Sequence, residues 1–294
     1  MGELRSTYRI VELASCLRQV SPTPELDIRF LLSEIIKKPI SEIFSEVVLT
    51  SHEYARLESM VVRRMRSEPI AYILGYCEFW GLRFRIDSSV LIPRPETECL
   101  VEAVLQQAID QKAHCLDLGF GSGAIALALA HERPDWIIHG VDQSDKALAI
   151  ASDNARMHDV SHDRVSFSLG DWRLGLPGLD LGDTCYDVVV SNPPYVEEGS
   201  SFLSQGTELY EPVSALYSGH QGLDDLSHII RLSPQLLHEG GWLYLEHGFN
   251  QALAVRQLLS DVGFVHVGTQ KDLSGHERIS YGQYKVCGGG LSHD

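Results

Sequence analysis

The chain has 294 residues, 44% of them hydrophobic, and a formal net charge of −16 at pH 7. This length is sufficient for one large domain and a smaller one, each with a core of its own. No apolar run approaches the roughly 18 residues that span a bilayer, so no membrane association is expected. The six cysteines are scattered without a C-x-x-C pair. We therefore expect a reduced, cytoplasmic protein with structural thiols.

The charge is unevenly distributed along the chain. Residues 1–90 carry 12 Lys/Arg and 12 Asp/Glu, so the remaining 12 Lys/Arg and 28 Asp/Glu place the whole net charge after residue 90. An acidic surface repels phosphate backbones, because nucleic-acid binding relies on Lys and Arg that displace counterions. The larger part of the chain is therefore not expected to act directly on nucleic acid.

The first 74 residues predict a small helical bundle. A first helix is expected over Tyr8–Val20, capped by Ser6 or Thr7. A second is expected after Thr23, with a proline in its first turn and apolar residues at helical spacing. Short amphipathic helices of this kind bury their apolar faces against one another.

A third helix and a hairpin follow. Thr50 and Glu53 have the spacing of a capping box, which predicts a helix that begins just after Thr50. Apolar and charged residues alternate over Leu82–Asp87, a pattern typical of a half-buried strand. We expect residues 75–92 to form a β-hairpin linker between the helical domain and a larger one.

Strand and helix patterns alternate through most of residues 93–286, the predicted larger domain. This alternation predicts an α/β fold with a mostly parallel sheet, helices on both faces and ligands at the carboxyl ends of the strands. The last two strand patterns have no helix between them and indicate an antiparallel hairpin on the sheet edge. Residues 287–294 are expected to form a flexible tail. Strands are expected within the segments 114–119, 136–142, 165–172, 186–192, 241–248, 264–270 and 278–286.

The first chemical motif is a glycine-rich loop between a strand and a helix. Gly119, Gly121 and Gly123 lie where backbone N–H groups approach a ligand near a helix N-terminus. The spacing with Ala124 also satisfies the dinucleotide fingerprint, and Asp142 could bind the ribose of either NAD or S-adenosyl-L-methionine. These residues alone leave a methyl donor, a dinucleotide and a plain tight turn as alternatives.

The sequence "SNPPY" follows the fourth predicted strand of the large domain. Each proline fixes φ near −65° and removes a backbone donor, which holds the side-chain oxygen of Asn192 and the carbonyl of Pro193 pointing out of the strand end. Two fixed acceptors form a receptor for a planar –NH2 group, and Tyr195 can pack on the flat group that carries it. The motif favours a methyl donor and transfer to an amide or amino nitrogen. Such transfer is mostly a matter of positioning and needs no catalytic histidine. No metal site is expected.

Beyond these motifs the chain resembles the HemK/PrmC family, the peptide chain release factor N5-glutamine methyltransferases, over nearly its full length. The segments that carry the resemblance are "EPIAYILGYCEFWGLRF", "VLIPRPETE", "LDLGFGSGAIALALA", "VSNPPYV", "LYLEHG" and "GHERIS". The resemblance implies a Rossmann-like class I S-adenosyl-L-methionine-dependent methyltransferase domain with a seven-stranded sheet. It also implies an N-terminal helical domain that recognises the release factor, whose Gly-Gly-Gln glutamine is methylated.

The resemblance also implies roles for individual residues. The donor S-adenosyl-L-methionine, which leaves as S-adenosyl-L-homocysteine, would contact the glycine loop, the ribose-binding Asp142 and the adenine-lining Trp172. The substrate glutamine would be clamped by Asn192–Tyr195, with Asn192, Pro193 and Tyr195 as catalytic residues and Pro194 in the substrate site. The family usually has a small residue at the position of Phe120, so this ring must turn away from the donor or narrow its pocket. The full set of expected donor-binding residues is Asp117, Gly119, Phe120, Gly121, Ser122, Gly123, Asp142, Asp171, Trp172 and Asn192.

Two other functions use the same residues. An amino-methyltransferase acting on adenine or guanine of nucleic acid would share the Asn-Pro-Pro-Tyr clamp, although the acidic C-terminal part opposes it. A non-catalytic adaptor would bind a nucleotide and dock a partner through the N-terminal helices. The expected partner of the leading interpretation is a release factor, bound by a monomer.

Overall fold

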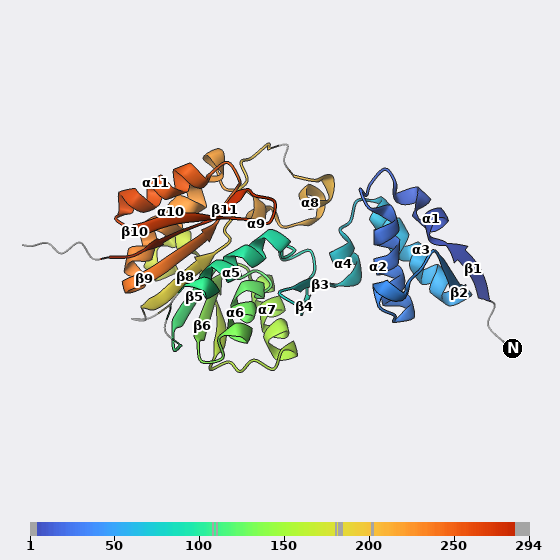
Figure 1. The fold of residues 1–294 in the computed structure, drawn as a ribbon, viewed down its shortest axis with the longest axis horizontal. Helices are drawn as coiled ribbons and strands as arrows, with labels where there is room; N and C mark the ends of the chain where they lie inside the picture. Colours follow the sequence, from blue (N-terminus) through green and yellow to red (C-terminus); the bar gives the residue numbers. More distant parts are fainter. Residues whose placement is uncertain are drawn as a thin grey trace, which may run out of the picture. The chain divides into compact units, whose positions relative to one another are not determined.

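The computed structural model describes residues 5–107, 109, 111–179, 181, 185–200 and 203–285, and Figure 1 labels its helices and strands. The expected tail over 287–294 lies outside the described residues. The chain divides into two compact units, of which the first comprises Met1–Cys77, Ile86–Ser88 and Ser201–Glu211. The larger second unit comprises Glu78–Arg85, Ser89–Ser200 and Pro212–Asp294. No helix among the described residues has the length and hydropathy required to cross a membrane.

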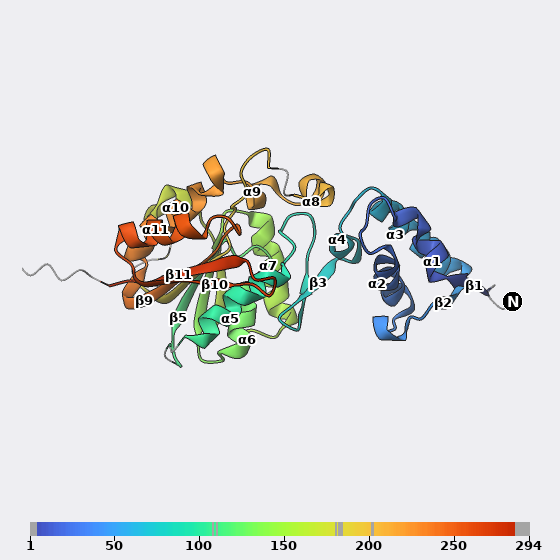
Figure 2. The same ribbon diagram turned by 45° about the horizontal axis from the view of Figure 1, so that its top comes forward.

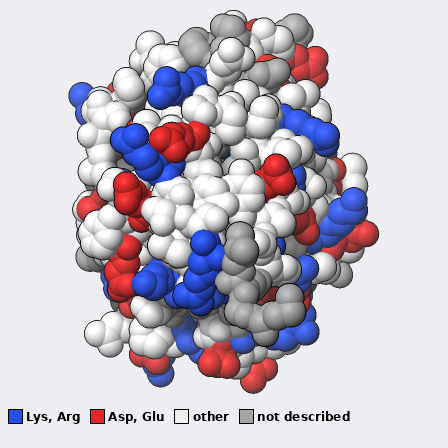
Figure 3. Space-filling view, turned by 90° about the vertical axis from the view of Figure 1, so that its right-hand side faces the viewer, with Lys and Arg blue, Asp and Glu red and all other residues white. Residues whose placement is uncertain are grey.

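The N-terminal unit is mostly helical. Buried side chains from its helices and from β2 form one apolar core that includes Leu17, Leu31 and Leu57. Figure 3, which faces this unit, shows basic and acidic side chains interspersed on the surface. Its elements are β1 (Arg5–Arg9), α1 (Ile10–Leu13), η1 (Ala14–Leu17), α2 (Pro24–Ile36), η2 (Ile40–Glu42), β2 (Glu46–Thr50), α3 (Ser51–Met65), α4 (Ile70–Leu74) and, from a later segment, α8 (Gln205–Tyr210).

The capping box predicted for the third helix is confirmed. The Thr50 hydroxyl accepts from the Glu53 backbone N–H at 3.2 Å, and the Glu53 carboxylate accepts from the Thr50 N–H at 2.8 Å. These bonds satisfy two donors that the first turn of a helix leaves without partners. The basic side chain of Arg64 in the last turn donates to Asp27 at 2.7 Å, which ties α3 to α2.

The start of the first predicted helix is wrong. Arg5–Arg9 form strand β1, paired antiparallel with β2, and the helix begins only at Ile10. Tyr8 stacks on Tyr54 of α3 with ring centroids 4.7 Å apart. The side chains of β1 show no clear apolar alternation. Its strand conformation therefore depends on a partner strand 37 to 45 residues away, which local propensity does not reveal.

A short hairpin forms within the segment 75–92, where the sequence predicted one. It consists of β3 (Tyr76–Phe79) and β4 (Leu82–Arg85), joined by Trp80 and Gly81 with φ of +55° and +69°. Positive φ at both central residues is typical of a two-residue type I′ turn. Within the second unit, Asn154 holds the end of β4, because its side-chain amide exchanges hydrogen bonds with the Arg85 backbone at 2.7 and 3.0 Å.

The second unit contains a seven-stranded sheet in the order β10-β11-β9-β8-β5-β6-β7. Strands β5 to β9 pair in parallel, whereas β11 is antiparallel to both β9 and β10. The mostly parallel sheet and the antiparallel hairpin on its edge are therefore confirmed. The strands are β5 (His114–Leu118), β6 (Ile137–Asp142), β7 (Val165–Leu169), β8 (Tyr186–Ser191), β9 (Leu237–Glu246), β10 (Val265–Lys271) and β11 (Glu277–Gln283).

Helices cover both faces of this sheet, with α10 and α11 on one side and α5 and α6 on the other (Figure 2). Branched apolar residues of the central strands, such as Val189, meet the apolar faces of α10 and α11 in a continuous core. The remaining elements are η3 (Pro95–Thr97), α5 (Glu98–Gln106), α6 (Ala124–Glu132), α7 (Asp145–Met157), η4 (Trp172–Leu174), η5 (Leu176–Gly178), α9 (Val213–Leu216), η6 (His220–Gly222), α10 (Asp224–Leu232), η7 (Ser233–Gln235) and α11 (Ala252–Val262).

Candidate active site

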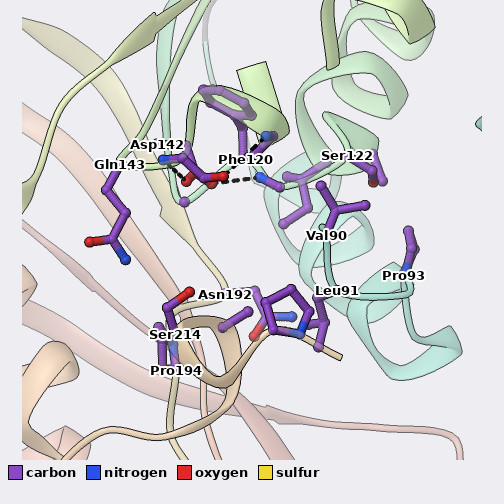
Figure 4. A pocket seen from close by; sticks show the side chains of 18 of the residues that line it. Val90, Leu91, Pro93, Phe120, Ser122, Asp142, Gln143, Asn192, Pro194 and Ser214 are labelled. Carbon is purple, nitrogen blue, oxygen red and sulfur yellow. Dashed lines mark hydrogen bonds between the residues drawn. The ribbon is translucent and has the colours of Figure 1, made fainter. Parts of the chain in front are cut away.

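A cavity of about 770 Å³, counting its open mouth, lies at the carboxyl ends of β5, β6 and β8. Its place in the sheet is typical of a ligand site. The chain runs from β5 to β6 and β7 on one side and then crosses back to β8 on the other side of β5, and open α/β sheets bind ligands where the strand order reverses in this way. Figure 4 shows Asp142 and Phe120 on one side of the cavity and Asn192, Pro194 and Ser214 on the other.

The glycine loop forms one wall of the cavity. Gly119, Gly121 and Gly123 have φ of +81°, +52° and +81°, a region that side chains with a Cβ rarely adopt. The Gly119 N–H donates to the carbonyl of Val141 at 2.7 Å and joins the loop to the end of β6. A Cβ on Gly121 would meet no atom within 4 Å, so this stretch of backbone adjoins open space. The loop therefore presents main chain to the cavity.

Asp142 ends β6 beside this loop. Its Oδ2 accepts from the Gly121 N–H at 3.0 Å, and its Oδ1 accepts from the Ser144 N–H at 2.9 Å. Burial raises the pKa of the carboxyl, an effect that these backbone donors partly offset. Each carboxylate oxygen retains a lone pair for a further donor. Asp142 is thus a fixed double acceptor on the cavity wall.

Phe120 packs against the ring of Phe167 and also lines the cavity. Its ring lies 4.7 Å from that of Phe167 between centroids, and its side chain is buried. Gly140 of β6 makes this possible, since a Cβ there would come within 2.9 Å of Phe120 Cδ1 and 2.6 Å of Phe167 Cδ1. The bulky ring is accommodated by the missing side chain of Gly140.

Trp172 lies across the glycine loop, with ring atoms 3.3 Å from where a Cβ on Gly119 would be. Its indole Nε1 donates to Asp225 Oδ1 at 2.9 Å. The same carboxylate accepts from Arg173 and from the Ser218 hydroxyl, and these hydrogen bonds lower its pKa against the opposing effect of burial. A buried, fully partnered carboxylate therefore fixes the plane of the indole.

Asn192 at the end of β8 is held through its amide nitrogen. Nδ2 donates to the hydroxyl of Thr97 in η3 at 3.1 Å. Among the described residues, none donates to its side-chain oxygen. Asn192, Thr97 and Pro194 all line the cavity. The oxygen of Asn192 is thus the end of the amide left to accept from a ligand.

Tyr195 lies next to the cavity lining and is tied to the end of β9. Its hydroxyl donates to Glu246 Oε1 at 3.1 Å, and its backbone carbonyl accepts from Gln251 Nε2 at 3.0 Å. Burial and the neighbouring Glu246 carboxylate raise the pKa of the phenol well above its usual range. The hydroxyl therefore stays protonated and acts as a donor.

Not all the predicted site residues meet at the cavity. Asp117 is fully buried within β5, and its two carboxylate oxygens have no hydrogen-bond partner in the described part of the chain. The carboxylate of Asp171 caps η4 by accepting from the Arg173 N–H at 2.9 Å. Gly123, Pro193 and Tyr195 are neighbours of lining residues in the chain and are not themselves part of the lining. The predicted residues that do line the cavity are Gly119, Phe120, Gly121, Ser122, Asp142, Trp172, Asn192 and Pro194.

Sequence reasoning missed several residues of the site. Thr97 and Asp225 contact the predicted residues Asn192 and Trp172, and the segment Ser89–Leu91 forms part of the lining. Thr97 lies within the segment "VLIPRPETE", but no role was predicted for this threonine from the sequence. For Asp225, at the start of an amphipathic helix, the sequence carries no signal beyond a charge suited to a helix N-terminus. No group of three or more potential metal ligands occurs among the residues described.

The fold and the site define a methyltransferase of the Rossmann-like α/β class. A methyltransferase domain model matches residues 109–263, and a PrmC N-terminal domain model matches residues 10–75. A methyltransferase structure from Pyrococcus furiosus shares the fold, with a TM-score of 0.51, 15% identity, and coverage of 78% of this chain and 98% of that one.

Relatives in sequence are more specific. The release factor glutamine methyltransferase of Vibrio cholerae is 42% identical over 90% of this chain and 92% of its own length. The enzyme of that name from Escherichia coli is 40% identical over 90% and 94%. The chain belongs to the release factor glutamine methyltransferase family.

Proposed function

We propose that this protein transfers a methyl group from S-adenosyl-L-methionine to the side-chain amide nitrogen N5 of the glutamine in the Gly-Gly-Gln motif of peptide chain release factors. The observation that supports this most directly is the tethering of Asn192: its amide nitrogen donates to Thr97, while no residue in the described part of the chain donates to its oxygen. An acceptor fixed in this way suits the N–H of a carboxamide. The names of the relatives supply the identity of the protein that carries it.

The cavity lining fits this donor. Gly121 leaves open space beside its backbone, which the methionine part can approach, and Asp142 has lone pairs for the two ribose hydroxyls. The indole of Trp172, fixed by Asp225, offers a flat surface to adenine. Phe120 and Ser122 complete the wall near the methionine part. When bound, the donor supplies an electrophilic methyl group on a sulfonium.

The residues of the clamp act on the nucleophile. An amide nitrogen is a poor nucleophile because its lone pair is delocalised into the carbonyl. Asn192 Oδ1 and the Pro193 carbonyl accept its two N–H bonds, which raises electron density on nitrogen and fixes its direction. Tyr195 packs on the plane of the carboxamide. The methylated nitrogen loses its proton readily, so no strong base is assigned.

The partner follows from the same reasoning. The excess of acidic residues after residue 90 disfavours a nucleic-acid substrate, because they repel its phosphate backbone. A protein loop carries no such backbone and is not repelled in this way. We propose that the enzyme acts as a monomer on a release factor in the cytoplasm. None of the five cysteines among the described residues forms a disulfide, as suits a reducing compartment.

Mass spectrometry of a release factor incubated with this protein and S-adenosyl-L-methionine tests the proposal. The peptide with the Gly-Gly-Gln glutamine should gain one methylene, and a factor with that glutamine changed should gain none. Asn192→Ala should still bind S-adenosyl-L-homocysteine through the glycine loop, Asp142 and Trp172, yet form no product. Absence of methylation on a folded factor, with donor binding intact, would exclude the proposed substrate.

A further inference from the structure

Gln251 is a buried side-chain amide that the proposed reaction does not use. It is 7% exposed and stands at the N-cap position of α11, yet its side chain makes no capping bond to that helix. Its Nε2 donates instead to the backbone carbonyls of Tyr195 at 3.0 Å and Gln221 at 2.7 Å, and its Oε1 accepts from the Gly248 N–H at 2.7 Å. Both amide protons are therefore used on the main chain of two separate loops.

The partners of this amide fix its orientation. Nε2 faces two carbonyl oxygens, which only accept, and Oε1 faces a backbone N–H, which only donates. A flipped amide would set its oxygen against two carbonyl oxygens and its NH2 group against a donor. One side chain thus joins the Asn-Pro-Pro-Tyr corner to η6 and to the loop between β9 and α11.

The backbone around the amide leaves room for it at two glycines. A Cβ on Gly222 would lie 2.0 Å from the Tyr195 carbonyl oxygen and 2.8 Å from Gln251 Nε2. A Cβ on Gly248 would lie 3.0 Å from Gln251 Oε1. Gln221 has a φ of +55°, which is uncommon for a residue with a Cβ and persists only where the surroundings fix it. The main chain on both sides is therefore shaped to the bonds of this amide.

The Asn-Pro-Pro-Tyr corner needs such support because its two prolines have no N–H to donate. Two of its bonds are made by its own side chains, from Asn192 Nδ2 to the Thr97 hydroxyl and from the Tyr195 hydroxyl to Glu246, each at 3.1 Å. Gln251 instead holds the main chain of the corner, at the Tyr195 carbonyl. The direction in which the corner leaves β8 therefore depends on Gln251.

We propose that Gln251 is a positioning residue whose side-chain amide, by donating to the Tyr195 carbonyl, holds the Asn-Pro-Pro-Tyr corner where Asn192 accepts from the substrate amide. The inference rests on the proposed function for the identity of that substrate. The bonds of Gln251 themselves lie within the second unit and do not depend on it. Because the hydrogen bonds of Asp142 and Trp172 do not pass through Gln251, its loss should lower turnover and leave binding of S-adenosyl-L-homocysteine intact.

Gln251→Met tests this role by keeping the size of the side chain and removing all three of its hydrogen bonds. The kcat on a release factor should fall about 10- to 100-fold, because a small misplacement of a positioning group costs up to about 100-fold. The Kd for S-adenosyl-L-homocysteine, measured by calorimetry, should change by less than about threefold, since residues without shared partners act independently.

Gln251→Glu distinguishes the lost hydrogen bonds from general damage. An ionised carboxylate has no proton for either carbonyl, whereas a protonated carboxyl can donate to one of them. Burial and the two facing carbonyl oxygens disfavour the charged form, so the pKa of the introduced carboxyl should lie above its usual value. The ratio of variant to wild-type kcat should therefore rise about tenfold as the pH falls from about 8 to about 5, whereas the ratio for Gln251→Met should stay constant. Each ratio for Gln251→Glu is compared with the same variant at another pH, so the result does not require Gln251→Met to fold.

The same two substitutions at Gln257 provide matched controls. Gln257 lies on the exposed side of α11, where its Nε2 donates to Asp261 at 2.8 Å. Both control variants should keep the wild-type kcat at every pH. Wild-type kcat in Gln251→Met, or a constant ratio for Gln251→Glu, would overturn the proposal. Division by the wild-type rate removes the titration of groups that all variants share, which on the elements around Gln251 include Tyr195, Asp224, Asp225, Glu246, His247 and Arg278.

A readout without substrate distinguishes this inference from the proposed function. The side-chain NH2 resonances of Asn192, assigned by their loss in Asn192→Ala, should shift in Gln251→Met and keep their wild-type positions in Gln257→Met. In Gln251→Glu they should move back toward the wild-type positions as the pH falls. If they behave in this way while the wild type does not methylate a release factor, the proposed substrate fails and the positioning role stands. If they are unchanged in both Gln251 variants, the positioning role fails whatever the substrate.

Discussion

The indole nitrogen of Trp172 donates to the buried carboxylate of Asp225 at 2.9 Å, across 53 positions of sequence. The wall proposed for adenine is thus oriented by a residue at the start of α10. Asp225 is also the partner of Arg173 and Ser218, so one acid holds donors from three residues in two separate segments. A carboxylate with this many partners both stabilises the local fold and orients the indole of the site.

Asp225→Asn should therefore weaken the donor site. The amide keeps one acceptor oxygen but loses the charge that holds Arg173, which leaves the indole less firmly oriented. We expect the Kd for S-adenosyl-L-homocysteine to rise about tenfold and the free energy of unfolding to fall by about 1–3 kcal/mol. Calorimetry and urea denaturation measure the two effects. Asp261→Asn on the exposed side of α11 serves as the control, and an unchanged Kd in Asp225→Asn would show that Trp172 needs no such anchor.

Gly140→Ala should disturb the aromatic pair beside the glycine loop. The new Cβ would lie 2.6 Å from Phe167 and 2.9 Å from Phe120, so a ring must move. We expect a loss of about 1–3 kcal/mol in the free energy of unfolding, and weaker donor binding as Phe120 is pushed toward the cavity.

The double variant Gly140→Ala/Phe120→Ala tests whether displacement of Phe120 causes the weaker donor binding. Removal of the displaced ring should restore donor binding, although not stability, because the contact with Phe167 remains. If donor binding is as weak in the double variant as in Gly140→Ala, displacement of Phe120 is not the reason.

Asp117→Asn should alter the dependence of stability on pH. Burial raises the pKa of Asp117 from 3.8 to about 7, so the folded state binds its proton more tightly than the unfolded state. The stability contributed by the protonated form is complete below about pH 4 and is lost as the pH rises to about 7. Asn stays neutral, so the variant should gain stability relative to the wild type from pH 5 to pH 8, on the order of 1 kcal/mol or more.

Urea denaturation at a series of pH values measures this difference. The exposed Glu58, changed to Gln, provides a control whose pH profile should parallel that of the wild type. Parallel profiles for Asp117→Asn and the wild type would mean that Asp117 does not keep its proton on folding.

Thr50→Ala should destabilise the N-terminal unit without affecting the donor site. The substitution removes the hydroxyl that accepts from Glu53 in the capping box, which is typically worth about 1 kcal/mol. Calorimetric binding of S-adenosyl-L-homocysteine should remain at the wild-type value. A large loss of donor affinity would indicate that this helix cap matters beyond its own unit.

The sequence by itself predicted the features that depend on neighbouring residues. The alternation of strand and helix predicted the parallel sheet, and the glycines at 119, 121 and 123 coincide with positive φ at all three. The capping box at Thr50 and Glu53 formed as its spacing indicated. The Asn-Pro-Pro-Tyr corner also follows the strand it was expected to end. For the glycine loop, the helix cap and the corner, the physical cause is a steric restriction or a bond within four residues, which acts locally.

Only the tertiary structure decided which groups support these motifs. The strand Arg5–Arg9 exists because β2 pairs with it, and the same residues were expected to lead into a helix. Thr97 reaches Asn192, and Asp225 reaches Trp172, over 95 and 53 positions. Such contacts depend on how the sheet brings strand ends together, and a single side chain's sequence context does not encode its distant partner. The motifs therefore indicate the chemistry of the site. The orientation of the motif side chains depends on residues that only the folded chain brings into contact with them.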